Sequence, residues 1–443
     1  MNTNITTPPL ALRSIALLTL AFTLSTGHTA AVAQESPLVR NSKLEMDRMS
    51  NVQEWRLELK KTKATDPPNE TFGIRQGLAS ALANAGDQDR AIAEFDAYIH
   101  LRNKQDELKG QRSSSAAPTP DDLAQLDAAN VQDALSTIVE QARSRRIVIL
   151  NEAHHVPMHR AFAMRLAREL RKLGFDYLAC ETFRIDATDM LQAGHVETLT
   201  GYYSTEPAYV KFLIDAKASG WKFVSYEPRD DADQTLNTAD WRETRMASNL
   251  VDRVFKLNPS AKLFVYVGYG HAQKLPASKG DADGSKMAAQ LKRLTGHDPL
   301  SIDQTTWYGQ RRNERDPKLY EHILRKIPAE TAQPVILMGQ DGRSLLLDEK
   351  AAMYDLQIVY PNLQGLRSYG RPRWMSSIGQ YQPLPIPSQY AAIKGQQLLY
   401  VFRATDPINA MPVDVVPLYA GKPLPHAMVP AGTKGDYRFL VEK

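Results

Sequence analysis

The sequence has a single cysteine, Cys180, in 443 residues, so it can form neither an intrachain disulfide nor a zinc site built from several cysteines. It also lacks a strong charge of either sign, since 54 lysines and arginines stand against 50 aspartates and glutamates. So small a surplus does not indicate a nucleic-acid-binding surface or a polybasic membrane anchor. The 43% of apolar residues are sufficient for two or three packed domains. We therefore expect a small-molecule or protein partner and no nucleic acid.

A stretch near the N-terminus has the pattern of a cleaved export signal. Arg13 precedes the apolar run Ile15–Leu24, and Ala31-Val32-Ala33 matches the small-x-small pattern before a signal peptidase site. The run is about half of the roughly 20 apolar residues that a membrane-spanning helix needs. The sequence thus predicts that residues 1–33 are a signal peptide, that the protein is periplasmic or secreted, and that it has no stable membrane anchor.

Composition and hydrophobic periodicity divide the rest of the chain into four parts. Residues 34–109 are predicted to be helical, with an αα-hairpin around Ala85-Gly86-Asp87 that resembles one tetratricopeptide unit. Residues 110–122 have the composition of a linker. Residues 123–333 alternate short apolar runs with amphipathic helices, and residues 334–443 are rich in proline between strand-like runs.

This organisation predicts an α/β fold: a mixed, mostly parallel sheet with flanking helices, an N-terminal helical hairpin and a small C-terminal β module. A single helical repeat is too short for the extended groove of a repeat array, so we expect the hairpin to be a packing element. A protein partner for the hairpin is the alternative.

Polar side chains follow the apolar strands expected at 147–150, 175–180, 223–226 and 263–267. Three of those strands end in acids or histidines, namely Glu152, His154, His155, Glu181 and His271. Ligands of open α/β sheets bind beyond the carboxyl ends of the strands, so these side chains are candidate catalytic residues. A carboxylate beside an imidazole suits general-base activation of water, because it fixes the tautomer and stabilises the imidazolium.

Further polar residues lie near these strand ends in the sequence. Arg242 and Asn249 share one face of a helix predicted over 240–250, together with Met246. We expect that face to point into the site, which makes Arg242 a further candidate catalytic residue. The candidate substrate-binding residues are His159, Arg160, Asn249 and Tyr269.

In order and spacing, three segments resemble motifs of one known family. Asn151-Glu152-Ala153-His154-His155 is similar to a Gly-Glu-x-x-His loop, and residues 242–249 are similar to an Arg-x-x-x-Met-Ala-x-Asn helix. Gly268-Tyr269-Gly270-His271-Ala272 resembles a second histidine loop. These are motifs of the erythromycin esterase family, whose superfamily also holds ChaN-type haem-binding proteins and Tiki-type metalloproteases. The resemblance covers roughly residues 140–310.

The resemblance implies a metal-independent hydrolase in which a histidine, held by a glutamate, activates water to attack an ester or lactone carbonyl. The esterase spacing would make His155 the base, with Glu152 and Glu181 as its partners, whereas the ChaN spacing Glu-x-His selects His154. Both histidines are therefore candidates for the base.

The resemblance also implies that Arg242 and His271 bind the substrate or stabilise the oxyanion. This chain departs from the family at Asn151 and Val156, where glycines are usual. We therefore expect a small-molecule ester other than a macrolide as the substrate.

Two other classes stay open. In a Tiki-like metallopeptidase, a divalent ion would be held by Glu152, His154, Glu181 and His271. In a ChaN-like protein, haem iron would be ligated by His155, His159 or a tyrosine of the pair Tyr202-Tyr203. No cofactor is predicted for the esterase, and a divalent metal ion or haem are the alternatives.

Overall fold

The computed structural model describes the chain in the ranges 37–63, 68–108, 119–184, 195–197, 200–228, 239–274, 286–309, 317–347, 353–361, 363, 365–432 and 435–442. The predicted signal peptide, residues 1–33, lies outside these ranges, as does most of the predicted linker, residues 110–122. Within the described ranges, no helix combines the length and the apolar character needed to span a membrane.

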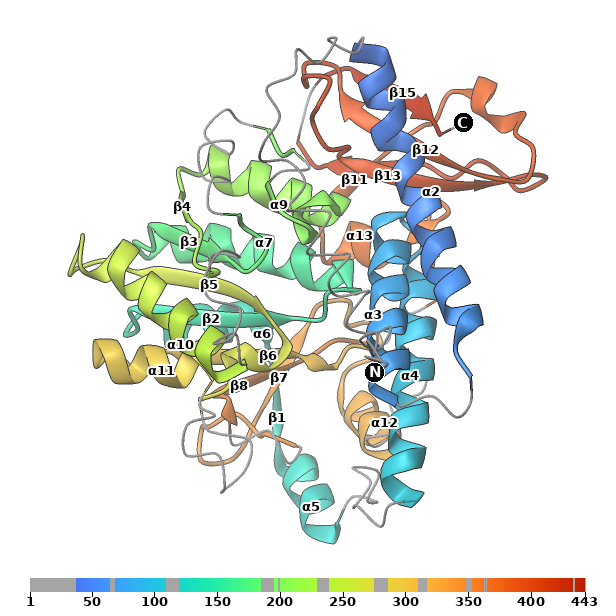
Figure 1. Cartoon of the computed structure of the whole chain (residues 1–443). Coiled ribbons are helices and arrows are strands. Elements are labelled where there is room, and N and C mark those ends of the chain that lie inside the picture. The colour runs from blue at the N-terminus through green and yellow to red at the C-terminus, as the bar shows by residue number, and fades with distance from the viewer. Residues whose placement is uncertain are drawn as a thin grey trace, which may run out of the picture.

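An eight-stranded sheet forms the centre of the protein (Figure 1). Its strands are β1 (Asn130–Asp133), β2 (Ile147–Glu152), β3 (Tyr177–Cys180), β4 (Lys222–Val224), β5 (Leu263–Gly268), β6 (Leu300–Trp307), β7 (Val335–Met338) and β8 (Leu356–Val359). Their order across the sheet is β1-β7-β8-β6-β2-β5-β3-β4. Only β7 runs against its neighbours, and the other pairs are parallel. The predicted α/β class with a mixed, mostly parallel sheet is confirmed.

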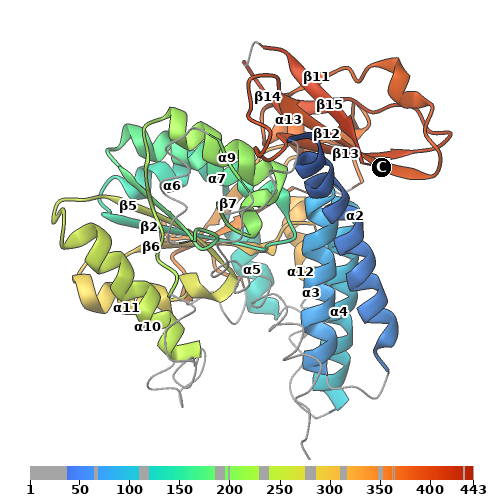
Figure 2. The ribbon, with the colours of Figure 1, turned by 45° about the horizontal axis from the view of Figure 1, so that its top comes forward.

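Helices cover both faces of the sheet, as Figure 2 shows. They are α6 (Ala134–Ala142), α7 (Pro157–Lys172) and α9 (Pro207–Ala218) on one face, and α10 (Ala239–Leu250) and α11 (Met287–Thr295) on the other. In β2, Val148 and Leu150 pack into the first layer, whereas Ile147 and Ile149 pack into the second. Because both faces are buried, the first four residues of β2, Ile147–Leu150, form an uninterrupted apolar run.

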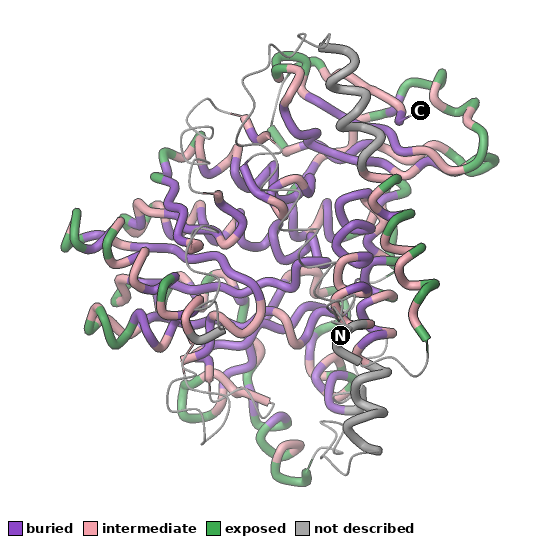
Figure 3. The backbone as a smooth tube through the Cα atoms, in the orientation of Figure 1, coloured by how far each residue is buried: buried purple, intermediate pink, exposed green. Residues whose placement is uncertain are grey.

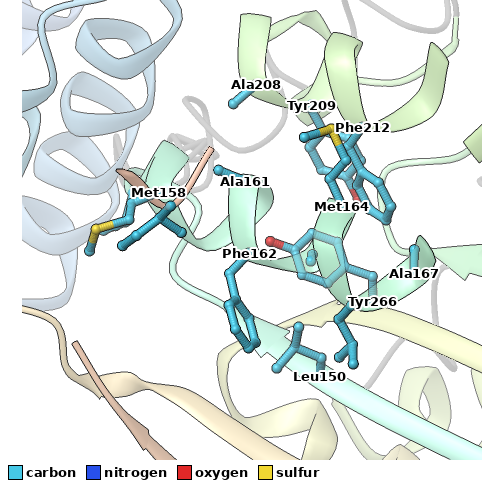
Figure 4. Close-up of a cluster of buried hydrophobic side chains, with 14 of the residues drawn as sticks. Leu150, Met158, Ala161, Phe162, Met164, Ala167, Ala208, Tyr209, Phe212 and Tyr266 are labelled. Carbon is cyan, nitrogen blue, oxygen red and sulfur yellow. The ribbon is translucent and has the colours of Figure 1, made fainter. Parts of the chain in front are cut away.

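Aromatic side chains fill the first layer. Figure 4 shows Phe162 of α7, Tyr209 and Phe212 of α9, and Tyr266 of β5 gathered near Leu150. All five side chains are at most 1% exposed. The buried strands appear as the purple centre of Figure 3. This layer fixes α7 and α9 relative to the carboxyl end of β2, where the candidate residues lie.

The N-terminal helices are α2 (Pro37–Lys61), α3 (Pro68–Asn84) and α4 (Gln88–Leu108). The predicted hairpin is α3 and α4, joined by a turn in which Gly86 has a φ of +74°. At Gly77 in α3, a Cβ would lie 2.5 Å from the Trp55 ring of α2, so glycine permits the close approach of these helices. Together α2, α3 and α4 form what we call the N-terminal helical unit.

The C-terminal strands form three small antiparallel sheets, which we call the C-terminal β unit. Their strands are β9 (Arg367–Ser368), β10 (Arg371–Pro372), β11 (Tyr381–Leu384), β12 (Gln396–Arg403), β13 (Asp414–Tyr419), β14 (Ala427–Pro430) and β15 (Tyr437–Val441). Leu78 and Leu82 of α3 share a hydrophobic cluster with Leu398, Tyr400 and Phe402 of β12. The N-terminal helical unit and the C-terminal β unit therefore pack against each other.

Two features differ from the predicted boundaries. Strands β7 and β8 belong to the main sheet although they follow residue 334, where the β module was expected to begin. Helix α5 (Pro120–Ala128) begins inside the predicted linker, and the Thr119 side chain accepts a hydrogen bond from the Asp122 N–H at its start. Two further helices are α12 (Pro317–Lys326) and the short α13 (Trp374–Ser377). Strands β7 and β8 belong to the main sheet through their pairing partners, which a local pattern does not show.

Candidate functional site

Parallel pairing brings the ends of β2, β3 and β5 to one edge of the sheet. Glu152, the last residue of β2, pairs with Gly268, the last residue of β5. Glu181 directly follows β3, which is the other neighbour of β5. A short 3-10 helix (Tyr269–Ala272) follows β5 and carries His271. Three of the predicted strand-end groups therefore lie together.

A buried ion-pair cluster forms the inner side of the site. Arg160 donates from Nε to Glu152 Oε2 at 2.9 Å and from Nη1 to Glu206 Oε2 at 3.1 Å. It also donates from Nη2 to the His154 carbonyl at 2.8 Å. Burial acts to raise the pKa of Glu152, but the Arg160 charge and the hydrogen bonds outweigh it and hold that pKa well below its usual range. Glu152 is therefore an ionised carboxylate at neutral pH.

His154 shares the Glu152 carboxylate with Arg160. The His154 Nδ1 lies 2.9 Å from Glu152 Oε1. Because an ionised carboxylate can only accept, Nδ1 donates its proton and Nε2 carries the lone pair. A Cβ at Gly268 would lie 2.5 Å from that Nε2 and 2.8 Å from Glu181 Oε2. The free nitrogen of His154 and the Glu181 carboxylate therefore meet at the same glycine.

Glu181 joins the inner and outer parts of the site. Its Oε2 accepts a hydrogen bond from the Gly268 N–H at 2.5 Å, and its Oε1 accepts one from Arg242 Nη2 at 3.0 Å. Burial acts to raise the pKa of Glu181, but His271, His154 and Arg242 outweigh it and lower the pKa to about 2. Glu181 is ionised and fixed between two strand ends.

Arg242 of α10 connects three side chains. It donates to Glu227 from Nε at 3.0 Å and from Nη2 at 2.8 Å, in addition to its bond to Glu181. Its Nη1 lies 3.1 Å from His271 Nε2. Of the predicted helix face, Arg242 lies in the site, with its guanidinium between two carboxylates and an imidazole, whereas Met246 packs in the core.

His271 has its own carboxylate partner. Its Nδ1 lies 2.8 Å from Glu243 Oε1, and the other oxygen of Glu243 accepts a hydrogen bond from the Met287 N–H at 2.8 Å. Lys286 Nζ lies 3.3 Å from the same carboxylate. Burial acts to lower the pKa of His271, but the hydrogen bond to Glu243 and the charge of Glu181 raise it above its usual value. Because a guanidinium can only donate, His271 Nε2 accepts from Arg242 while Nδ1 donates to Glu243.

His155 lies apart from this network. It is fully buried, and its ring stacks on Phe95 of α4 with ring centroids 4.0 Å apart. Its Nδ1 lies 3.3 Å from the Tyr269 hydroxyl and its Nε2 lies 3.1 Å from the Tyr308 hydroxyl. Burial lowers the pKa of His155 well below its usual value. Both ring nitrogens are occupied, so this geometry does not suit the base that the esterase spacing implies.

His159 and Arg160 lie behind the site. The His159 Nδ1 accepts a hydrogen bond from the Ala153 N–H at 3.1 Å, and burial lowers the pKa of His159 to about 3. The exposed fractions of the two residues are 0% and 1%. The prediction that they contact substrate does not fit this burial, because the helix that carries them packs into the core. Arg160 instead supports Glu152.

Tyr269 and Asn249 contact neighbouring protein groups and position parts of the site. Tyr269 has a φ of +41°, which is unusual for a residue with a side chain, and Asn151 Nδ2 donates to its carbonyl at 3.0 Å. The edge of its ring meets the His154 ring with centroids 5.1 Å apart. Asn249 Nδ2 donates to the Tyr226 carbonyl at 2.9 Å and so ties α10 to the chain after β4.

Three glutamates of the network were not predicted. Glu227 follows β4, so the strand-end rule applied to that strand would have found it. Glu243 is the sequence neighbour of Arg242, but only folding shows that it faces His271. Glu206 precedes Pro207 and caps α9, a local signal of helix start rather than of a site.

The site is buried around Glu152 and His154 and more exposed to solvent around Arg242. The side chains of Glu152, His154 and Arg160 are 3%, 6% and 1% exposed. Those of Arg242 and Glu227 are 34% and 23% exposed. A ligand would therefore approach from the Arg242 side.

The residues named for a metal site do not fit one. Both Glu152 oxygens accept from Arg160, and the Glu181 oxygens accept from Gly268 and Arg242, so these donor atoms are already occupied. In the part of the chain that the structure describes, no group of three or more histidine, cysteine, aspartate and glutamate side chains is placed to hold a metal ion.

Comparisons with known proteins do not assign a family. No family model and no curated protein matches the chain. Similar solved structures include "The structure of the type III effector HopBA1", with 16% identity and a TM-score of 0.29 over 40% of this chain and 88% of that chain. Another is "Bacterial protein toxins", with 17% identity and a TM-score of 0.29 over 46% of this chain and 44% of that chain. Likenesses this slight identify no function.

Proposed function

We propose that this protein is a hydrolase of the erythromycin-esterase type, in which His154 and Glu152 activate water to attack an ester or lactone carbonyl. One observation carries the proposal. Hydrogen bonds link Arg160, Glu152 and His154 in one group and Glu181, Arg242 and His271 in a second group, and the two groups meet at Gly268, at the carboxyl ends of adjacent parallel strands. A histidine–carboxylate pair can act as a general base towards water, and a neighbouring cationic group can stabilise the oxyanion; ester hydrolysis requires both.

In this mechanism His154 is the general base. Glu152 holds the Nδ1 proton at 2.9 Å, so Nε2 can take a proton from water, and the ionised carboxylate then stabilises the imidazolium. Arg160 keeps Glu152 ionised and oriented. His155 is the less suitable base because its two nitrogens face the hydroxyls of Tyr269 and Tyr308.

Arg242 and His271 would stabilise the negative charge that develops on the carbonyl oxygen. They lie 3.1 Å apart on the accessible side of Glu181, and the hydrogen bond to Glu243 fixes the orientation of His271. A guanidinium and an imidazole that are already oriented cost little reorganisation as the tetrahedral intermediate forms. Glu181 and Glu227 hold the guanidinium in place from its other edges.

The test is an assay of the purified protein on aryl esters and lactones, with and without a chelator. We expect activity that survives chelation, and a loss of about 10²–10⁴-fold in kcat for His154→Gln. His155→Gln should retain most activity if it folds. The matched control is His297→Gln, because His297 lies near Arg146 at the opposite ends of the strands. Full activity in His154→Gln would refute the proposal.

The same preparation separates the alternatives. Stoichiometric metal in protein purified without added ions, with activity lost on chelation, would favour the metallopeptidase. A saturable absorbance change on adding haem to the protein would favour the ChaN-like class. Stoichiometric metal is not expected, because the carboxylate oxygens of Glu152 and Glu181 already accept hydrogen bonds.

A further inference from the structure

The loop between β3 and α9 places an aromatic ring flat on the proposed base. Tyr203 lies parallel to His154, with ring centroids 3.8 Å apart and 10° between the ring planes. Tyr269 meets the same imidazole edge-on, at 5.1 Å and 88°. With Glu152 on Nδ1, the imidazole is held at one face, one edge and one nitrogen, and Nε2 stays directed at Gly268.

The Tyr203 loop is in turn held by the N-terminal helical unit. Arg48 of α2 donates from Nη2 to the Thr205 carbonyl at 2.7 Å and from Nη1 to the Asn84 carbonyl at the end of α3. Asn51, one turn further along α2, hydrogen-bonds Tyr202. Helix α2 therefore contacts the loop on both sides of Tyr203, at Tyr202 and at Thr205.

Arg48 is half-buried and contacts a second element besides the Tyr203 loop. Its guanidinium also lies over the ring of Tyr400 in β12, with 5.7 Å to the ring centroid, and burial lowers the pKa of Arg48. Its guanidinium donates to two backbone carbonyls. A guanidinium placed on carbonyls rather than on a carboxylate fixes backbone positions, since its planar fork sets direction as well as distance.

From these contacts we infer that Tyr203 is a positioning residue for His154, and that the N-terminal helical unit holds Tyr203 there through Arg48. The inference rests on the proposed function. A π face stabilises the imidazolium that forms when His154 accepts a proton, and contact over the whole ring restricts its rotation. The helical unit thus belongs to the catalytic assembly, in addition to its packing on β12.

The first test compares Tyr203→Phe with Tyr203→Leu. Phenylalanine keeps the flat face, so its kcat should stay within about threefold of wild type. Leucine removes the face, so kcat should fall about tenfold or more with KM nearly unchanged. Equal losses in both variants, or an unchanged kcat in Tyr203→Leu, would overturn the inference. Thermal melts of both variants check that they fold.

The second test addresses Arg48. Arg48→Met should lower kcat, and adding it to Tyr203→Leu should cause little further loss, because both changes act on the same ring. Arg56→Met, on the same helix, is the matched control and should be silent. Independent, multiplicative losses in the double variant would show that Arg48 does not act through Tyr203.

A spectroscopic test does not depend on activity. In protein labelled at histidine Cε1, the His154 signal, identified by its absence in His154→Gln, should be shifted upfield by the Tyr203 ring. The shift should persist in Tyr203→Phe and disappear in Tyr203→Leu. A wild-type protein that hydrolyses no ester would refute the proposed function, while this spectrum would still decide the placement. A His154 signal that does not move in Tyr203→Leu would overturn it.

Discussion

Arg160 binds Glu152 through two nearly parallel hydrogen bonds, from Nε to Oε2 at 2.9 Å and from Nη2 to Oε1 at 3.1 Å. Both side chains are at most 3% exposed. A bidentate ion pair that is this deeply buried orients the carboxylate plane and keeps the carboxylate ionised. The orientation of His154 therefore depends on Arg160, which the helix after β2 delivers.

Replacing Arg160 should destabilise the fold strongly. Arg160→Met would leave Glu152 and Glu206 buried without their counter-ion, at a cost of about 3–5 kcal/mol in the free energy of unfolding. Urea unfolding measures this. The control is Arg143→Met, whose exposed pair with Glu140 should contribute less than about 1 kcal/mol. Similar small effects in both variants would contradict the predicted role.

Gly268→Ala should damage the site without disturbing the strand. Its backbone angles, φ −75° and ψ 141°, suit alanine, but the new Cβ would lie 2.5 Å from His154 and 2.8 Å from Glu181. A shift of about 1 Å in these groups should lower kcat by about 10²-fold. At Gly270 the nearest atom to an added Cβ is 3.6 Å away, so Gly270→Ala is the matched control. Equal kinetics for the two variants would argue against this arrangement.

Glu181 should make the stability of the fold depend on pH in the acid range. Its pKa is lowered from 4.5 to about 2, so its contribution is fully present above pH 4.5 and is lost as the pH falls through 2. The size is about 3 kcal/mol. Glu181→Gln should therefore be less stable than wild type at pH 7, and the gap should close towards pH 2. Urea titrations at several pH values measure it, and a gap independent of pH would contradict the assignment.

Replacing Lys211 of α9 with an apolar residue should stabilise the fold. It is 1% exposed, its Nζ donates to the Met428 carbonyl at 3.0 Å, and it lies over the Tyr381 ring. Burial lowers its pKa to about 8, so wild-type stability should rise as the pH increases from 8 towards 10.5. Lys211→Met should gain about 1–3 kcal/mol at pH 7, and less above pH 10. Calorimetry at both pH values checks this, and a destabilised variant at pH 7 would oppose it.

Much of the main sheet could be predicted from the sequence, because buried parallel strands are apolar runs. Strands β2, β3, β4 and β5 and helix α7 appeared where the pattern put them. Strands β7 and β8 were not assigned to this sheet, because which strands pair is a nonlocal property that an apolar run does not show.

The strand-end rule identified Glu152, Glu181 and His271 because parallel pairing must bring such ends to one edge of a sheet. It did not separate His154 from His155, which are adjacent in the sequence. Their side chains turn to different surroundings, one to Glu152 and the other to Phe95. That difference arises from helices packed on the strand end, so no local pattern contains it.

By itself, the sequence determined the class of fold and the chemistry available, since it places glutamate and histidine after apolar strands and has only one cysteine. Tertiary structure alone decided which carboxylate each imidazole meets and that α2, from the far N-terminus, holds the loop carrying Tyr203. The physical reason is that apolar periodicity is a local property of the chain. Pairing between charges depends on distances that only the packed core sets.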